Sequence, residues 1–401
     1  MVSRIMAGCI SLLLVLSSSC SSSTPDQLPI STPKFTPEIP TATVTPPALP
    51  TATPTPPPTQ VPSDAISHEN LMQVHLLHEY WSIVATAAGA DPYEMDISAI
   101  AASPQGRFLA VGGCSKPLEA DLRSGSIYCN GEDPESPEGR PFLLILDVDT
   151  ETVVGTISEN EPATTVADLA FSYDGEKLIY ALYPGKFAVW DVASARLESI
   201  LWEGDSSAPR IAVSPDGHWI ALKTTDQAMI WDAPAGEFVA EIPAYFRPQF
   251  SADGGRMMVY RDQEFIIYET GTWTELVRFG IPCDCVYAVS PDFSLFATSA
   301  RAPTENAPIL IWDISTGEQL QTLEGNEGFT DFLLFTPDGK MLWRARERGD
   351  LMAWNTSDWR FLAGQIGGVT PIFNLHGFQF VGNGRYYLLF SDLHLGLYGL
   401  P

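Results

Sequence analysis

Cysteine is the residue type in this 401-residue chain whose spacing suggests the most chemistry. A thiol can form a disulfide, bind a metal ion or carry a lipid. Four of the six cysteines lie far from the N-terminus, at Cys114, Cys129, Cys283 and Cys285. Four cysteines allow three disulfide pairings. A Cys-x-Cys disulfide is strained, so a redox or metal-binding role for Cys283 and Cys285 stays open as the alternative to pairing.

Other residue patterns give little support to catalysis or to a bound cofactor. The chain has no Gly-x-Ser-x-Gly nucleophile motif, and Ser214–Trp219 has the wrong spacing for a sialidase-type Asp box. The acidic segment Glu132–Glu135 lacks the alternating oxygen ligands of a calcium loop, and no histidine spacing supports another metal. We therefore predict a protein that is not an enzyme and that binds no metal and no cofactor.

The charge balance excludes two classes of partner. The chain has 22 Lys and Arg against 49 Asp and Glu, a formal net charge of -27. Nucleic-acid binders need basic residues to displace counterions from phosphates, and peripheral proteins need them to bind anionic lipid. We expect neither kind of binding. An aromatic content of 11% with 10 Trp is too high for a largely disordered chain.

The first nineteen residues have the organisation of an export signal. Arg4 supplies a positive charge and Ile10–Leu16 an apolar run that is too short to span a bilayer. The following Ser17–Cys20 resembles the bacterial lipobox, although Ser17 stands where that motif usually has an aliphatic residue. The resemblance implies lipidation of Cys20 and an extracytoplasmic protein attached to the membrane by lipid alone. The alternative is plain secretion after cleavage at Ser19.

Residues 20–63 have the composition of a spacer. Between Thr24 and Pro62, 13 of 39 residues are Pro and 10 are Thr. Such a segment cannot bury a core, so we expect a disordered, extended stalk of polyproline-II character. At ~3.1 Å per residue its reach is on the order of 100 Å. A flexible linker without a spacer role is the alternative.

A turn motif recurs through the remaining residues, 64–401. Its first copies are Ser103–Gly106, Ser172–Gly175, Ser214–Gly217 and Ser251–Gly254, and its later copies are Ser290–Phe293, Thr336–Gly339 and the degenerate Val381–Gly384. The spacings are 69, 42, 37, 39, 46 and 45 residues. Apolar runs flank each copy, as Arg210–Val213 and Trp219–Leu222 do. Pro, Asp and Gly favour tight turns, so each copy predicts a hairpin of two strands.

A second motif follows most of these turns. It consists of Trp190–Asp191, Trp231–Asp232, Trp312–Asp313 and Trp354–Asn355, with Tyr268–Glu269 as a weaker form. Each pair ends a third strand, and a turn and a fourth strand follow. Four strands in about 40 residues, repeated along the chain, is the pattern of a β-propeller. Through these motifs, residues 66–401 resemble the WD-repeat propeller family.

The chain departs from that family because it lacks the Gly-His pair that opens many WD repeats. The buried Asp-His-Ser-Trp hydrogen-bond network of the family is therefore not expected, and blade rigidity should come from apolar packing. Propellers outside the WD family that share the Ser-Pro-Asp-Gly turn remain the rival interpretation.

Seven turns predict an all-β, seven-bladed propeller. The last repeat stops after its third strand, Leu395–Leu400, while an extra strand, Leu71–Tyr80, precedes the first repeat. In WD propellers the N-terminal strand completes the final blade and leaves no unpaired edge. The surplus strand and the missing strand therefore match, and we expect a ring closed by the N-terminal strand.

Irregular loops are predicted to gather on one face, which we call the top face. It carries the loops between second and third strands and the connections between blades. The insertion Cys114–Pro141, the blade entries Trp81–Asp96 and Cys283–Cys285, and the loop Arg301–Pro308 belong there. Because blades 1 and 5 are well separated, Cys114 should pair with Cys129, and Cys283 with Cys285. The stalk should leave from the opposite, bottom face, so the top face would point away from the membrane.

Variable loops on a rigid scaffold commonly carry binding. We therefore expect a monomeric, non-catalytic interaction or scaffold propeller that binds an unknown protein or peptide. The candidate binding face comprises Trp81, Tyr93, Glu94, Tyr128, Glu132, Asp133 and Glu305. Neutral insertions at loop tips are one alternative. Another is a propeller enzyme or glycan-binding protein that uses acidic residues at the channel mouth.

Overall fold

The chain divides into two units, and every residue described below belongs to the second, Pro56–Pro401. The computed structural model describes residues 65–67, 69, 71–90, 95–115, 140–157, 165–280, 285–300, 307–323, 330–346, 351–364, 375–381, 384–391 and 394–400. The predicted signal sequence, the lipidation site Cys20 and the stalk lie outside these residues.

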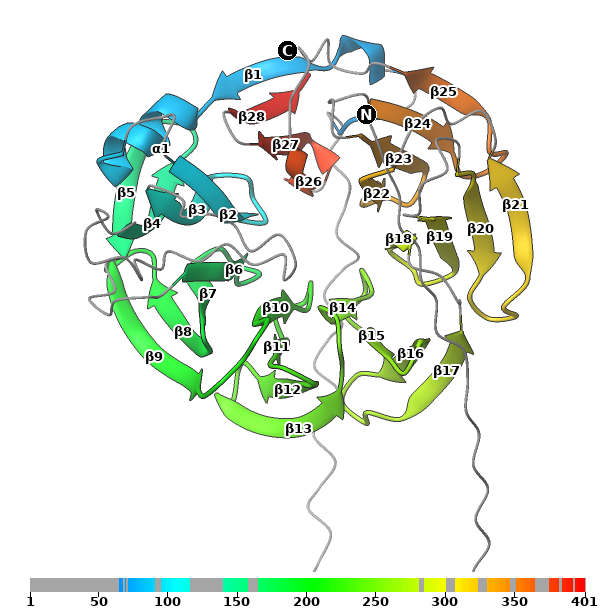
Figure 1. Cartoon of the computed structure of the whole chain (residues 1–401), viewed down its shortest axis with the longest axis horizontal. Helices are drawn as coiled ribbons and strands as arrows, with labels where there is room; N and C mark the ends of the chain where they lie inside the picture. The colour runs from blue at the N-terminus through cyan, green and yellow to red at the C-terminus, as the bar shows by residue number, and fades with distance from the viewer. Residues whose placement is uncertain are drawn as a thin grey trace, which may run out of the picture. The chain divides into compact units, whose positions relative to one another are not determined.

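The described part of the second unit contains seven four-stranded antiparallel sheets, arranged as the blades of a propeller (Figure 1). Blade 1 comprises β2 (Met95–Ala102), β3 (Phe108–Ser115), β4 (Arg140–Asp147) and β5 (Thr152–Ile157). Blade 2 comprises β6 (Thr165–Phe171), β7 (Lys177–Tyr183), β8 (Lys186–Asp191) and β9 (Arg196–Glu203). Blade 3 comprises β10 (Arg210–Val213), β11 (Trp219–Lys223), β12 (Gln227–Asp232) and β13 (Glu237–Pro243).

The remaining blades repeat this order. Blade 4 comprises β14 (Gln249–Phe250), β15 (Arg256–Arg261), β16 (Glu264–Glu269) and β17 (Glu275–Gly280). Blade 5 comprises β18 (Cys285–Val289), β19 (Leu295–Ala300), β20 (Ile309–Asp313) and β21 (Gln319–Leu323). Blade 6 comprises β22 (Phe332–Phe335), β23 (Met341–Ala345), β24 (Leu351–Asn355) and β25 (Phe361–Gly364). Blade 7 comprises β26 (Leu375–Val381), β27 (Tyr386–Ser391), β28 (His394–Gly399) and β1 (His75–Glu79).

The N-terminal strand closes the ring, which confirms the predicted architecture. Strand β1 pairs antiparallel with β28, with His75 opposite Gly399 and Glu79 opposite Gly396. Figure 1 shows β1 in blue at the outer edge of blade 7, beside the red strands from the other end of the chain. The strand is shorter than the expected Leu71–Tyr80, because Leu71–Gln73 forms a turn of 3₁₀ helix, η1, instead.

Apolar side chains fill the seven interfaces between neighbouring blades. The described residues form seven separate hydrophobic clusters, and each draws its side chains mainly from two adjacent blades. At the closing interface, Leu388 and Leu395 of blade 7 pack with Leu109 and Leu144 of blade 1. Burial of one such side chain contributes roughly 1.5–3 kcal/mol. The closing interface is thus built from the same kind of contact as the other six.

Five copies of the recurrent turn, those that begin with Ser172, Ser214, Ser251, Ser290 and Thr336, contain the same side-chain hydrogen-bond network. In the turn after β10, the hydroxyl of Ser214 donates to Asp216, and the Trp219 N–H donates to Ser214 Oγ over 2.8 Å. Gly217 has a φ of 71°, a value that glycine adopts without strain. In the fifth copy Phe293 occupies the equivalent place with a φ of 54°, and its buried ring packs in the interface between blades 4 and 5.

The Trp-Asp pairs mark the turns between third and fourth strands. In blade 5, Asp313 Oδ1 accepts hydrogen bonds from the N–H groups of Ser315 and Thr316 over 2.8 and 2.9 Å. The indole nitrogens of Trp190 and Trp231 are buried and have no hydrogen-bond partner in the described part of the chain. Apolar packing therefore holds these two indoles, whereas the indole N–H of Trp312 donates to Thr298 Oγ1 over 3.0 Å. Membership of the WD-repeat family stays a prediction.

One helix, α1 (Trp81–Ala88), lies between blades 7 and 1. We predicted an irregular loop for Trp81–Asp96, and its first half is helical instead. Trp81, Val84 and Ala85 are buried with the i, i+3, i+4 spacing of one helix face, and they pack in the closing interface. Gly89 ends the helix with a φ of 64°. Among the described residues, no helix is long and apolar enough to cross a membrane.

Candidate functional site

Strand direction assigns every loop of the ring to one of two faces. Antiparallel neighbours place the turns between first and second strands on the same face as those between third and fourth strands. This is the bottom face, and the remaining connections make the top face. The Ile66 N–H donates to the carbonyl of Gly384, in the bottom turn of blade 7, over 2.9 Å. The described chain therefore begins at the bottom face.

Most of the predicted site residues lie outside the described part of the chain. These are Cys20, Tyr93, Glu94, Tyr128, Cys129, Glu132, Asp133, Cys283 and Glu305. Cys285 begins β18, and its side chain is not described. Cys114 lies near the end of β3 and is buried. The described residues therefore do not show whether the residues of the predicted binding face lie together.

Trp81 is the one member of that face whose side chain is described, and it is buried. Its side chain is 5% exposed and belongs to the hydrophobic cluster between blades 7 and 1. The sequence predicts a binding position for Trp81 on an irregular loop, and this prediction is wrong because a helix begins there and buries the ring. Trp81 supports the closing interface from the top side of the ring.

A buried carboxylate, Asp168 on β6, connects three blades at the top inner rim of the ring. Its Oδ2 accepts a hydrogen bond from the backbone N–H of Ile211 on β10 over 2.7 Å. The Nε of Arg247, in the connection between β13 and β14, donates to the same oxygen over 3.1 Å. A second Arg247 nitrogen pairs with Asp168 Oδ1. In Figure 1, β6, β10 and β14 follow one another along the inner edge of the ring.

Two further cations lie beside this pair. Arg210 opens β10 and is directly opposite Lys223, the last residue of β11. The Nη1 of Arg210 donates to the carbonyls of Ala167 and Pro209 over 3.1 and 2.9 Å. Lys223 Nζ lies 3.4 Å from the Ala208 carbonyl and 3.3 Å from that of Thr225. The top inner rim of blades 2 to 4, which we call the basic rim, therefore contains Arg210, Lys223 and Arg247 around Asp168.

Exposed aromatic rings adjoin the basic rim. Tyr245 and Phe246, directly before Arg247, are 46% and 49% exposed. The Phe246 ring stacks on Tyr260 at a centroid distance of 4.7 Å, and Tyr260 in turn packs on the buried Phe265. The Tyr245 N–H donates to the Tyr260 carbonyl over 2.8 Å. These contacts fix the loop, so Tyr245, Phe246 and Arg247 form a preorganised surface that we call the aromatic loop.

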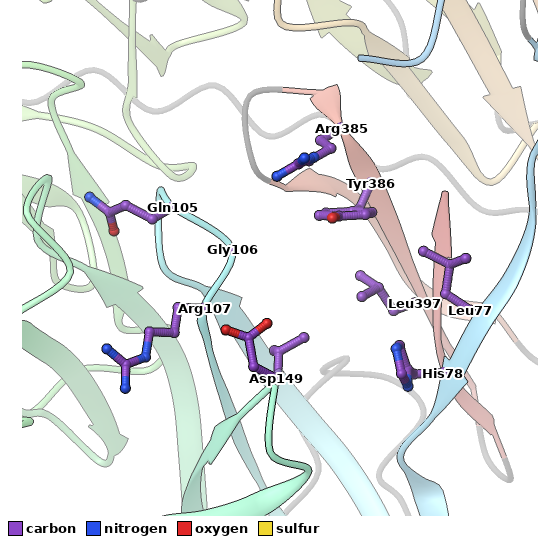
Figure 2. Close-up of a pocket in the computed structure, with 10 residues that line it drawn as sticks. Leu77, His78, Gln105, Gly106, Arg107, Asp149, Arg385, Tyr386 and Leu397 are labelled. Atoms are coloured by element: carbon purple, nitrogen blue, oxygen red, sulfur yellow. The ribbon is translucent and has the colours of Figure 1, made fainter. Parts of the chain in front are cut away.

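The bottom face carries a pocket at the seam between blades 7 and 1, with a volume of about 330 Å³. Figure 2 shows Arg385, Tyr386 and His78 from blade 7 on one side, and Gln105 and Asp149 from blade 1 on the other. Next to the pocket, His78 Nδ1 lies 2.6 Å from Glu151 Oε1, so an ion pair or hydrogen bond also crosses the seam. The mixed charges of this pocket suit a polar contact and give no arrangement of nucleophile and base.

A second bottom pocket, of about 550 Å³, lies between blades 1 and 2. Its lining includes Phe108, Val154 and Val192, together with Arg107 and Asp147. Burial raises the pKa of Asp147, but hydrogen bonds from the Thr150 N–H and the Arg107 guanidinium outweigh that effect and lower it. The carboxylate thus stays ionised and acts in the turn rather than as a proton donor.

Sequence comparison adds no relative. No family model matches the chain, and no curated protein matches it significantly. The described residues contain no group of three or more His, Cys, Asp or Glu side chains that could hold a metal ion. The sequence analysis missed the aromatic loop. Tyr245-Phe246-Arg247 places two rings and a cation in a connection between blades, which is outside the repeated pattern of strands and turns.

Proposed function

We propose that this protein is a non-catalytic binding propeller that holds a protein or peptide partner on its top face. The observation that carries the proposal is the aromatic loop, where Tyr245 and Phe246 are exposed on a rigid backbone beside Arg247. Aromatic residues and arginine dominate the energetics of protein interfaces, because they bury large areas and lose little conformational entropy. The closed ring supplies the fixed scaffold that such a surface needs.

The mode of display is part of the same proposal. We propose that lipid at Cys20 anchors the chain outside the cytoplasm and that residues 20–63 act as the stalk. The described chain begins at the bottom face, where the Ile66 N–H donates to the Gly384 carbonyl, and this is the face opposite to the one proposed to bind a partner. A disulfide between Cys114 and Cys129 fits an exported protein.

An enzyme or glycan-binding protein with acidic residues at the channel mouth is less well supported. Asp168, the buried carboxylate at the top inner rim, is already paired with Arg247 and bonded to the Ile211 N–H. A carboxylate held in this way is not free to attack a substrate or transfer a proton. Three cations, Arg210, Lys223 and Arg247, surround this buried carboxylate, which is the opposite of the acidic mouth that this alternative needs.

Affinity capture with the full-length chain tests the binding function. The unchanged chain and the double variant Tyr245→Ser, Phe246→Ser are each used as bait in extracts of the source cells. We expect at least one protein that is retained by the unchanged chain and weakened about tenfold or more by the double variant, because interface aromatics carry ~2 kcal/mol or more each.

The matched control is Tyr173→Ser, since Tyr173 is 44% exposed but lies in the bottom turn of blade 2. It should leave capture unchanged. Equal capture by the double variant and the unchanged chain would contradict the proposed binding face. The display proposal has a separate readout: Cys20→Ser should move the chain from the membrane fraction to the soluble fraction. Retention in washed membranes would contradict the lipid anchor.

A further inference from the structure

Arg210 and Lys223 are two like charges directly opposite each other in the β10–β11 ladder. Opposed residues of an antiparallel pair have their side chains on the same side of the sheet, about 5 Å apart at Cβ. Like charges in such a pair repel and destabilise the sheet. The position could carry an apolar residue, as the neighbouring Ile211–Leu222 pair does. The fold therefore holds a pair that its own stability does not favour.

Burial increases the cost of this pair. Lys223 is 3% exposed, and its Nζ contacts only backbone carbonyls, at 3.3 and 3.4 Å. Burial lowers the pKa of Lys223, and the charge of Arg210 lowers it further, while Asp226 acts in the opposite direction. Burial also lowers the pKa of Arg210, while the charge of Asp168 acts in the opposite direction and that of Arg247 lowers the pKa further. Within the described chain, neither cation forms an ion pair with a carboxylate.

The charge count around the rim leaves a positive excess. Arg247 uses its fork on Asp168, which is thereby satisfied. The other carboxylate of the rim, Asp226, attracts the charge of Lys223. It is exposed to solvent, where this attraction is screened. Three cations, Arg210, Lys223 and Arg247, thus face two carboxylates, Asp168 and Asp226, in a chain with a net charge of -27. A local positive site in such a chain concentrates anions that the rest of the surface repels.

We propose that the basic rim is an oxyanion-binding site, in which Arg210 and Lys223 bind a carboxylate or a phosphate of the ligand held on the top face. Charge-assisted hydrogen bonds from Arg and Lys to such oxyanions are short and strong. The oxyanion relieves the repulsion between the two cations, so the ligand supplies the partner that the sheet lacks. The site adjoins the aromatic loop, and its role in partner binding rests on the proposed function.

The first test measures anion binding on the full-length chain without any partner protein. Thermal melting is followed while sodium phosphate, sodium acetate or a tetraglutamate peptide replaces sodium chloride at constant ionic strength. A ligand that binds only the folded state raises the melting temperature with a saturable dependence on concentration. We expect this rise with the unchanged chain, and the comparison of phosphate with tetraglutamate shows which oxyanion the site prefers.

The variants Lys223→Met and Arg210→Gln each remove one cation and keep most of the side-chain volume. Lys223→Met should melt at the same temperature as the unchanged chain or higher in chloride, because the repulsion is gone. It should weaken oxyanion binding about tenfold or more, through the loss of a charge-assisted bond. Lys340→Met, in a bottom turn and 76% exposed at its side chain, is the control and should bind as the unchanged chain does.

The outcomes separate this site from the proposed function. Equal stabilisation of the unchanged chain, Lys223→Met and Arg210→Gln by every anion would overturn the oxyanion site, since it would reflect a general salt effect. The partner-capture result for Tyr245→Ser, Phe246→Ser stands apart from this measurement. Loss of capture there together with absent anion binding would leave the binding face intact and refute only the basic rim.

Discussion

Asp168 on β6 and Arg247 in the entry to β14 form an ion pair, although 79 residues separate them in sequence. All of blade 3 lies between them along the chain. The same carboxylate also accepts the N–H of Ile211 in that blade. One buried acid therefore connects the inner strands of blades 2 and 3 to the loop that enters blade 4. The pair also fixes the base of the aromatic loop, because Arg247 directly follows Phe246.

Asp168→Asn should lower the free energy of unfolding by about 2 kcal/mol, since hydrogen bonds to charged groups contribute ~1.5–3 kcal/mol. The loss is limited because the Arg247 side chain is 47% exposed and water can solvate it. Urea unfolding of Asp168→Asn, Arg247→Gln and the double variant gives a double-mutant cycle. We expect a coupling of about 1 kcal/mol or more, and additive effects would show that the pair does not hold the blades together.

Deletion of residues 71–80 should expose the edge of β28 and the apolar side chains of the closing interface. An unpaired strand edge promotes aggregation, so the deleted chain should aggregate or lose its cooperative melting transition. Leu76→Lys is the control, because Leu76 is exposed on the same strand and its change should leave melting intact. A melting curve that the deletion leaves unchanged would argue against closure by β1.

Acid should weaken the fold through the turn aspartates. Hydrogen bonds from Ser315 and Thr316 lower the pKa of Asp313, and a hydrogen bond from Ser172 is the main cause of the lowered pKa of Asp174. Because the folded-state pKa of each carboxyl lies below the ordinary 3.8, the ionised carboxylates stabilise the fold fully above pH 3.8. This stabilisation is lost as the pH falls from 3.8 through the folded-state pKa. Urea unfolding between about pH 5 and pH 2.5 measures this loss.

The variant Asp313→Asn tests the assignment of that acid sensitivity. Since its side chain does not titrate, the stability difference between Asp313→Asn and the unchanged chain should shrink as the pH falls below 3.8. A difference that is constant with pH would mean that the ionised form of Asp313 contributes nothing to the fold.

The propeller could be predicted because its signals are local. Each Ser-Pro-Asp-Gly turn and each Trp-Asp pair specifies a turn within a few residues, and the spacing of the copies gives the blade count. The helix at Trp81–Ala88 was missed because its buried stripe is short and its burial depends on the closing interface. Phe293 shows a similar limit, since a non-glycine residue takes the positive φ there.

The candidate site was out of reach of the sequence for a different reason. The positions of Asp168 and Arg247 have no sequence relationship, and only ring closure brings them together. The Arg210–Lys223 pair depends on the strand register, which a sequence pattern does not fix to single residues. Topology predicts that the irregular loops gather on the top face. The residues of the basic rim and the aromatic loop were identified from burial and contacts in the structure.

Site-specific photocrosslinking tests most directly whether the top face binds a partner. Benzoylphenylalanine is placed at position 245 or, as the bottom-face control, at position 173 in the full-length chain, and the source cells are irradiated. The two sites are 46% and 44% exposed, so they differ in face rather than in accessibility. A discrete crosslinked partner from position 245 alone is the expected result. The same partner from position 173, or from position 173 alone, would contradict the account.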